Sequence, residues 1–247
     1  MEKGICSPIR ELTRGTKSKI KVHVLKKWEN IDFNTHEVLS LDITLIDEEG
    51  DQIHASIPKD YMSIHGPKLT EGEAFYIENF DIGDPLGFHR PVVNEKKMIW
   101  RCDTFFKKAN EKMSVIPKFK FAFMEFEDAK SRFTENNKHL IDVIDRLTIL
   151  GRKKQILRKD GHETTLKELT IENTRGMSMR VSLFGNASEQ ISEEIAGDPE
   201  TIVIIIIASA CLRKFGFLST SICLVPVEDV ALVPGEDVAA WSSSNKD

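Results

Sequence analysis

The sequence predicts a mainly β protein that contains two tandem copies of one five-stranded Greek-key barrel. Three observations support this prediction: most of the chain reads as short strands, one strand–turn–strand unit occurs twice, and a short helix is expected between the third and fourth strands of each copy. The 247 residues are enough for one large domain or two small ones, each with its own core.

Five strands are expected in the first part of the chain. Residues 19–25, KIKVHVL, alternate apolar and polar side chains, which is the period of a half-buried strand. Residues 41–57 contain two such strands around a turn at residues 47–50. Residues 74–80 and 98–106 supply the last two strands, which completes a set of five.

The second part of the chain repeats this design. Residues 167–183 superimpose on residues 41–57 at an offset of about 126, so that Gly50 falls on Gly176 and the apolar positions coincide. A unit repeated at so large a separation indicates two copies of one domain, because the repeats of solenoid proteins recur every ~20–50 residues.

A short amphipathic helix is expected after each hairpin, at residues 61–69 and 186–195, and in the second copy further strands follow at residues 201–212 and 218–225. Three strands, a helix and two strands is the order of an OB-fold. The strand 2–3 face of this barrel and its loops 1–2 and 4–5 bind oligonucleotides or sugars.

These elements divide the chain into four parts. The expected boundaries are a first OB-fold at residues 1–115, a Phe-rich connecting segment at 116–139, a second OB-fold at 140–241 and a disordered tail at 242–247. We expect the connecting segment to pack on a barrel, because Phe119, Phe121, Phe123 and Phe126 make it too apolar for a free linker.

Composition excludes several classes of protein. Lys and Arg total 34 against 39 Asp and Glu, a net charge of -5, so binding to phosphates would need a local arrangement of charge. The longest apolar run, residues 201–212, is shorter than the ~20 residues of a membrane-spanning helix. Residues 1–12 contain no secretory signal, and the four cysteines form no CxxC pair, so we expect reduced thiols in an intracellular protein.

No catalytic motif is visible in the sequence. GxSxG, HExxH, GxxxxGK[ST] and GxGxxG are all missing, and the seven histidines have no metal-ligand spacing. We therefore expect no enzyme activity, no cofactor and no metal site.

Aromatic and basic residues occur together where a hairpin is expected at residues 213–217, RKFGF. There the ring of Phe215 can stack on a base while the charges of Arg213 and Lys214 meet phosphates. The alternative is a hairpin whose ring folds onto the barrel and whose two charges are solvated.

Three other aromatic residues allow two interpretations. Strand alternation points Phe184 opposite to Leu183, so its ring is an outward platform or a cover for the following helix. Trp100 lies among cations in the segment KKMIWR, yet a lone tryptophan in a strand often belongs to the core. Trp28 follows Lys26 and Lys27, and for it we favour the core.

With these residues in place, the chain resembles the tandem OB-fold DNA-binding region of the large subunit of replication protein A, in particular the plant replication-protein-A-like group. Six segments carry the resemblance, which are residues 19–29 (KIKVHVLKKWE), 41–57, 69–80 (LTEGEAFYIENF), 141–147 (IDVIDRL), 181–186 (VSLFGN) and 234–238.

The resemblance implies a single-stranded DNA-binding protein of the nucleus that acts in DNA replication, repair or recombination with little sequence preference. It implies other replication protein A-type subunits or recombination proteins as partners. Two alternatives stay open: an OB-fold that docks a peptide or another subunit, and a binder of single-stranded RNA.

The resemblance also implies which side chains bind. Trp100 falls at the strand-5 stacking position of the first domain, Phe215 at the loop 4–5 position of the second, and Phe184 replaces the tryptophan of the pattern TLWG, written here SLFG. His23 and His65 stand as weak substitutes for family residues. The expected contacts to the DNA backbone are Lys19, Lys21, Lys26, Lys27, Arg101, Arg213 and Lys214.

Overall fold

The computed structural model describes residues 6–32, 35–85, 90–109, 116–117, 120–132, 139–158, 161–192, 202–215, 219–223 and 230–233. Within these ranges, only the backbone is described for residues 130–132 and from 213 onward. The chain forms two compact units, Met1–Lys120 and Phe121–Asp247, and each is described by itself.

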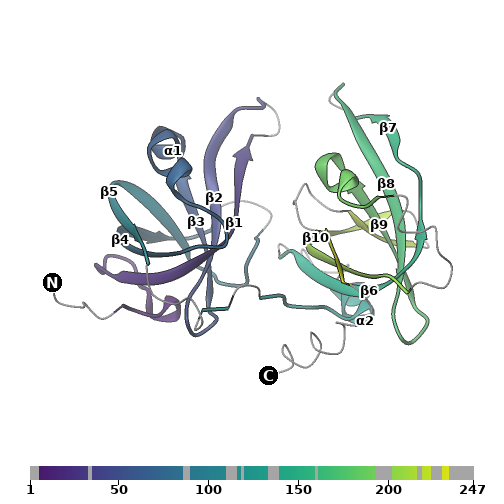
Figure 1. The fold of residues 1–247 in the computed structure, drawn as a ribbon, viewed down its shortest axis with the longest axis horizontal. Coiled ribbons are helices and arrows are strands. Elements are labelled where there is room, and N and C mark those ends of the chain that lie inside the picture. The colour runs from purple at the N-terminus through teal and green to yellow at the C-terminus, as the bar shows by residue number, and fades with distance from the viewer. Residues whose placement is uncertain are drawn as a thin grey trace. The chain divides into compact units, whose positions relative to one another are not determined.

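The first unit is a closed five-stranded barrel (Figure 1). Its strands are β1 (Lys19–Ile31), β2 (Val38–Ile46), β3 (Gln52–Pro58), β4 (Ala74–Gly83) and β5 (Lys97–Lys108). They pair in the order β1-β2-β3-β5-β4, and β4 pairs back with β1. The β3–β5 pairing is parallel and the others are antiparallel. This is the OB-fold order that the sequence predicts.

The barrel core follows from strand alternation. On β2 the side chains of Ile43 and Leu45 point inward, as do those of Ile53 and Ile57 on β3, and all four are fully buried. Two short helices follow β3: α1 (Lys59–His65) and the 3-10 helix η2 (Gly66–Lys68), besides the earlier 3-10 helix η1 (Ile9–Glu11). Figure 1 shows α1 at one end of the barrel.

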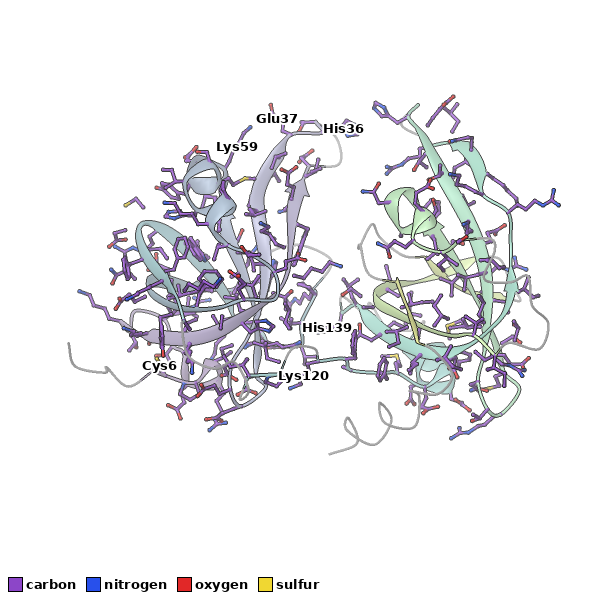
Figure 2. All side chains as sticks on the ribbon, in the orientation of Figure 1. Cys6, His36, Glu37, Lys59, Lys120 and His139 are labelled. Atoms are coloured by element: carbon purple, nitrogen blue, oxygen red, sulfur yellow. The ribbon has the colours of Figure 1, made fainter. Side chains whose placement is uncertain are left out.

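Two lysines of this unit form polar contacts at the ends of its helix and strands. Nζ of Lys59, at the start of α1, lies 3.9 Å from a carboxylate oxygen of Glu37, just before β2, and Figure 2 labels both residues. Nζ of Lys120, also labelled there, donates a hydrogen bond to the carbonyl oxygen of Gly50 in the β2–β3 turn.

The second unit repeats this ring. Its strands are β6 (Ile141–Leu150), β7 (Lys154–Leu157), β8 (Glu163–Glu172), β9 (Ser178–Phe184), β10 (Ile204–Phe215), β11 (Ser219–Cys223) and β12 (Val230–Val233). The path β6-β8-β9-β11 is closed by pairings of β10 with both β11 and β6, and β9–β11 is parallel, as β3–β5 is in the first unit. β7 and β12 add to the outside of this ring.

The region between β9 and β10 differs from the expectation. The sequence predicts an amphipathic helix at residues 186–195, whereas the structure has the 3-10 helix η3 (Gly185–Glu189). Residues 193–200 and the predicted tail at 242–247 lie outside the described residues.

The Phe-rich segment is shared between the two units. Ile116 packs in the first unit against Ile46, Ala74 and Ala109. Phe126 begins the helix α2 (Phe126–Arg132) and is buried in the core of the second unit. The boundary between the units therefore falls inside the predicted connecting segment.

Both barrels bend their fourth strand in the same way. Asn79 in β4 and Ser209 in β10 have positive φ angles of 62° and 55°. Each residue lies at a register shift, between Glu78 and Phe80 in one case and between Ile207 and Ala210 in the other. Matching β-bulges at equivalent places show that the duplication extends to the backbone.

One carboxyl group makes the second unit sensitive to pH. Burial, with the nearby Glu125, raises the pKa of Asp145 on β6 to about 6. Between pH ~4 and ~6 the folded chain holds a proton that the unfolded chain releases, so stability falls as pH rises through this window.

Asp145→Asn is therefore expected to raise the thermal midpoint of the second unit at pH 7.5 and to leave it unchanged at pH 4. The expected gain in the free energy of unfolding is about 1 kcal/mol. This is less than the raised pKa of a fully buried group would give, because solvent screens the partly buried Asp145. Calorimetric scans at the two pH values measure it. Equal changes at both would contradict the assignment.

Candidate functional site

Trp100, the predicted stacking residue of the first domain, lies inside the barrel. Its side chain is 1% exposed, and its ring centroid is 5.1 Å from that of Phe106 and 5.3 Å from that of His65. Met98 and Trp100 share the inward face of β5, so the cations that flank Trp100 point the other way. The stacking role predicted for Trp100 is therefore wrong, and the core interpretation is correct.

The two histidines proposed as substitutes are also enclosed. His65 is buried against Tyr61, Trp100 and Phe106. Burial, together with the charge of Lys68, lowers its pKa, so His65 is neutral at pH 7. His23 is 2% exposed, and its Nδ1 lies 3.2 Å from the carbonyl oxygen of Pro117. Neither ring offers an open face for a base.

Two of the predicted backbone cations lie on the β1–β4 side of the barrel. Nζ of Lys19 is 5.4 Å and Nζ of Lys21 is 6.0 Å from the ring centroid of Tyr76 on β4. Lys21 also forms an ion pair of 2.6 Å with Glu48. Both charges therefore interact with groups of the protein itself.

The other three predicted cations of the first barrel lie on β1 and β5. Nζ of Lys27 donates hydrogen bonds to the carbonyl oxygens of Gly66 (3.3 Å) and Leu69 (2.8 Å), which anchors η2 to β1. Arg101 pairs with carboxylates of its neighbours, Asp103 at 2.9 Å and Asp81 at 3.3 Å. Lys26 is the third, and it lies opposite Thr44 on β2.

The predicted residues of the second barrel are placed only in part. Phe184 ends β9, is half-buried, and pairs with Leu166. The backbones of Arg213, Lys214 and Phe215 belong to β10, so the strand runs three residues further than predicted. Their side chains lie outside the described residues, and their roles stay predictions.

The structure brings together a different group of side chains, on the outside of β1, β2, β3 and β5. We call it the Asp42 face, and it consists of Trp28, Asp42, His54, Ser56 and Lys97. Asp42 is at its centre, because its carboxylate accepts hydrogen bonds from four donors. These are Ser40 Oγ (2.6 Å), Ser56 Oγ (2.6 Å), His54 Nε2 (2.8 Å) and Lys97 Nζ (3.3 Å).

The charge of Asp42 is held in place by these donors. Burial of the carboxyl opposes ionisation, but His54, Lys97 and Ser40 outweigh it and hold the pKa of Asp42 well below its usual range. Asp42, His54 and Ser56 are buried although they point away from the core, so they form a sheltered and rigid floor.

Trp28 lies at the edge of this floor and is half-buried. Its ring stacks on His54, with the centroids 5.5 Å apart and 20° between the planes. Register places Trp28 opposite Asp42, and a register shift between Val24 and Lys26 precedes it on β1. The expectation that Trp28 belongs to the core is therefore wrong.

Sequence reasoning missed this face, although one signal was present. Polar residues recur at every second position on β2 and β3, at Asp42 and Thr44 and again at His54 and Ser56. In a barrel whose other face is apolar, such a pattern marks the outer surface.

Other kinds of site find no support in the part of the chain that the structure describes. These residues contain no group of three or more His, Cys, Asp or Glu side chains placed to hold a metal ion. No helix among them is long and apolar enough to cross a membrane.

Comparisons with known proteins agree with this architecture. Residues 14–129 match the family described as "Domain of unknown function DUF223". In fold, the chain is similar to a solved structure described as "Structure and Conformational Change of a Replication Protein A Heterotrimer Bound to ssDNA". The TM-score is 0.60 at 18% identity, over 96% of this chain and 55% of that one.

Two curated proteins are similar in sequence. Replication factor A protein 1 of Schizosaccharomyces pombe is 27% identical over 169 residues, which is 68% of this chain and 26% of that protein. A 70 kDa DNA-binding subunit of replication protein A from Arabidopsis thaliana is 24% identical over 218 residues, 87% of this chain and 34% of that protein. The chain thus spans a quarter to a third of the length of these relatives. Together these matches confirm that the chain resembles the OB-fold region of the replication protein A large subunit.

Proposed function

We propose that the protein binds single-stranded DNA through base stacking and backbone electrostatics, with little sequence preference, and acts in replication, repair or recombination in the nucleus. It acts by binding and not by catalysis. Its relatives support the proposal, since one is named a DNA-binding subunit and the solved structure similar in fold is a heterotrimer bound to single-stranded DNA.

The Trp28–His54 stack is the observation that carries the proposal. It lies on the face of an OB-fold barrel over strands β2 and β3, where such barrels bind oligonucleotides. An indole offers a flat apolar surface on which any base can stack, and each stacked base contributes about 1–3 kcal/mol. A hydrogen bond to Asp42 fixes the ring of His54, so the stack is held in position before a DNA strand binds.

Cations flank the stack on both sides. Lys26 precedes Trp28 on β1, and Lys97 lies next to His54 in the β3–β5 register. Lys97 forms an ion pair with Asp42, which offsets its charge, so the Asp42 face attracts phosphates only modestly. Binding therefore depends on stacking more than on charge.

The proposed partners follow from the same relatives. A chain that spans part of a replication protein A large subunit would work with other subunits of that type or with recombination proteins. DNA binding itself needs only this chain in the proposal, so it is measured without partners.

Fluorescence anisotropy of a labelled oligo-dT strand, titrated with the full chain at two salt concentrations, tests the proposal. Affinity is expected to fall with salt, with a slope of about -0.7 for each phosphate neutralised, and only a few phosphates are involved. No binding at micromolar protein in low salt would refute the function.

A protein-docking module is the second candidate, and the paired cations favour it. Lys21 and Arg101 both face carboxylates of this chain, which reduces the pull on phosphates. This candidate predicts a folded chain that binds neither DNA nor RNA.

Competition between matched RNA and DNA strands separates the two nucleic acids, because a contact to the 2′-hydroxyl favours RNA.

A further inference from the structure

The two barrels differ at equivalent positions of their outer faces. In the first barrel Trp28 lies opposite Asp42, and Lys26 lies opposite Thr44. The offset of the repeat places Thr170 and Glu168 on β8 at the positions of Thr44 and Asp42. In the second barrel Ile149 lies opposite Thr170, and the backbone N–H of Gly151 donates to the carbonyl oxygen of Glu168 at 2.7 Å. Gly151 therefore takes the place of Trp28.

A glycine is required at this position. A Cβ atom on Gly151 would lie 2.7 Å from the carbonyl oxygen of Glu168, closer than such contacts allow. The space that the indole of Trp28 fills in the first barrel therefore stays open in the second. A pocket of about 280 Å³ lies there, lined by Ile149, Gly151, Glu168, Leu169, Thr170 and Arg180.

The pocket has two walls and a polar floor. Thr170 lies between Ile149 on β6 and Arg180 on β9, so an apolar side chain and a guanidinium group border the same space. The side chain of Arg180 is exposed, and its guanidinium group makes no hydrogen bond or ion pair with the residues that the structure describes. A planar guanidinium with no partner stacks well on an aromatic ring, and an aliphatic side chain packs against the ring's other face.

Glu168 makes the pocket favour some nucleobases over others. Lys154 pairs with Oε2 of Glu168 at 3.2 Å, and within the described parts of the chain Oε1 has no hydrogen-bond partner. A carboxylate oxygen accepts from an exocyclic amino group, as Glu and Asp accept from N4 of cytosine. Thymine carries a carbonyl oxygen at that position, which a carboxylate repels.

We propose that this pocket binds one amino-bearing nucleobase, stacked between Ile149 and Arg180, with its amino group donating to Glu168. The inference rests on the proposed function and adds a base preference at one position to binding that is otherwise insensitive to sequence. In the first barrel, Trp28 occupies the corresponding space, so the indole there offers a surface for stacking.

Titration of the full chain with labelled oligo-dC and oligo-dT at pH 7.5 tests the inference, because these strands share backbone and ring size. The wild-type chain is expected to bind oligo-dC about fivefold more tightly. Glu168→Ala removes the preference. Glu172→Ala is the matched control. Glu172 lies further along β8 on the same face as Glu168, and it pairs with Arg146 instead. This control changes both affinities equally and keeps the preference.

Arg180→Lys provides a second variant, because it keeps the charge and removes the planar group. It is expected to weaken binding of oligo-dC about threefold or more at an unchanged salt slope. Equal affinities for the two strands in the wild type, or a preference that survives Glu168→Ala, would overturn the inference and leave DNA binding standing. Failure to bind either strand would refute the proposed function itself.

Discussion

Trp100→Ala is expected to destabilise the first barrel by about 3–5 kcal/mol, the cost of removing a large buried aromatic side chain. The indole is 1% exposed and contacts His65 and Phe106, so its loss leaves a cavity in the middle of the core. Urea unfolding followed by far-UV circular dichroism should show the transition of the first unit at lower denaturant, with that of the second unit unchanged.

Trp100→Phe is the control for this prediction. The indole Nε1 of Trp100 is buried without a hydrogen-bond partner among the described atoms, so a phenyl ring removes an unsatisfied donor and keeps most of the packing. We expect Trp100→Phe to be far more stable than Trp100→Ala. If Trp100→Ala instead kept full stability and lost DNA binding, Trp100 would be the stacking residue that the family resemblance implies.

Trp28→Ala is expected to weaken binding of oligo-dT about 5- to 150-fold, the effect of losing one stacked base at about 1–3 kcal/mol. The substitution removes the indole that stacks on His54 and leaves the hydrogen bonds of Asp42 in place. Anisotropy titration measures the change, and circular dichroism confirms that the barrel stays folded.

Phe105→Ala is a matched control on the same barrel. Phe105 is 53% exposed and lies where β5 pairs with β4, opposite Glu78 and away from the Asp42 face. Removing this ring changes the exposed aromatic area without touching the proposed platform, so affinity should stay within twofold of the wild type. Equal losses in the two variants would show that the effect is not specific to Trp28.

The fold was accessible from the sequence because its signals are periodic and local. Alternation at Ile43, Leu45 and Ile53 predicts the inward face, and the repeat of residues 41–57 at 167–183 predicts the second barrel. Within the described part of the helix predicted at 186–195, the structure has a 3-10 helix, because a short amphipathic pattern does not distinguish an α-helix from a 3-10 turn.

The site was less accessible because it depends on backbone irregularity. The register shift between Val24 and Lys26 changes which side chains of β1 point outward, so counting from the pattern of residues 19–25 misplaces Trp28. For Trp100, strand alternation indicates the core, because Met98 lies on the same face of β5. The family resemblance, however, favours a stacking role for Trp100. Ion pairs such as Arg101 with Asp81 join distant segments, and a sequence does not reveal them.

Crosslinking tests the central claim most directly. An oligo-dT strand carrying 5-iododeoxyuridine, bound to the full chain and irradiated, forms a covalent bond to an aromatic residue in stacking contact, which peptide mapping then identifies. We predict an adduct on Trp28, on the outer face of β1 beside His54. A bound strand that crosslinks to Phe105, with none of the adduct on Trp28, would contradict the assignment of the Asp42 face as the DNA-binding surface of the first barrel.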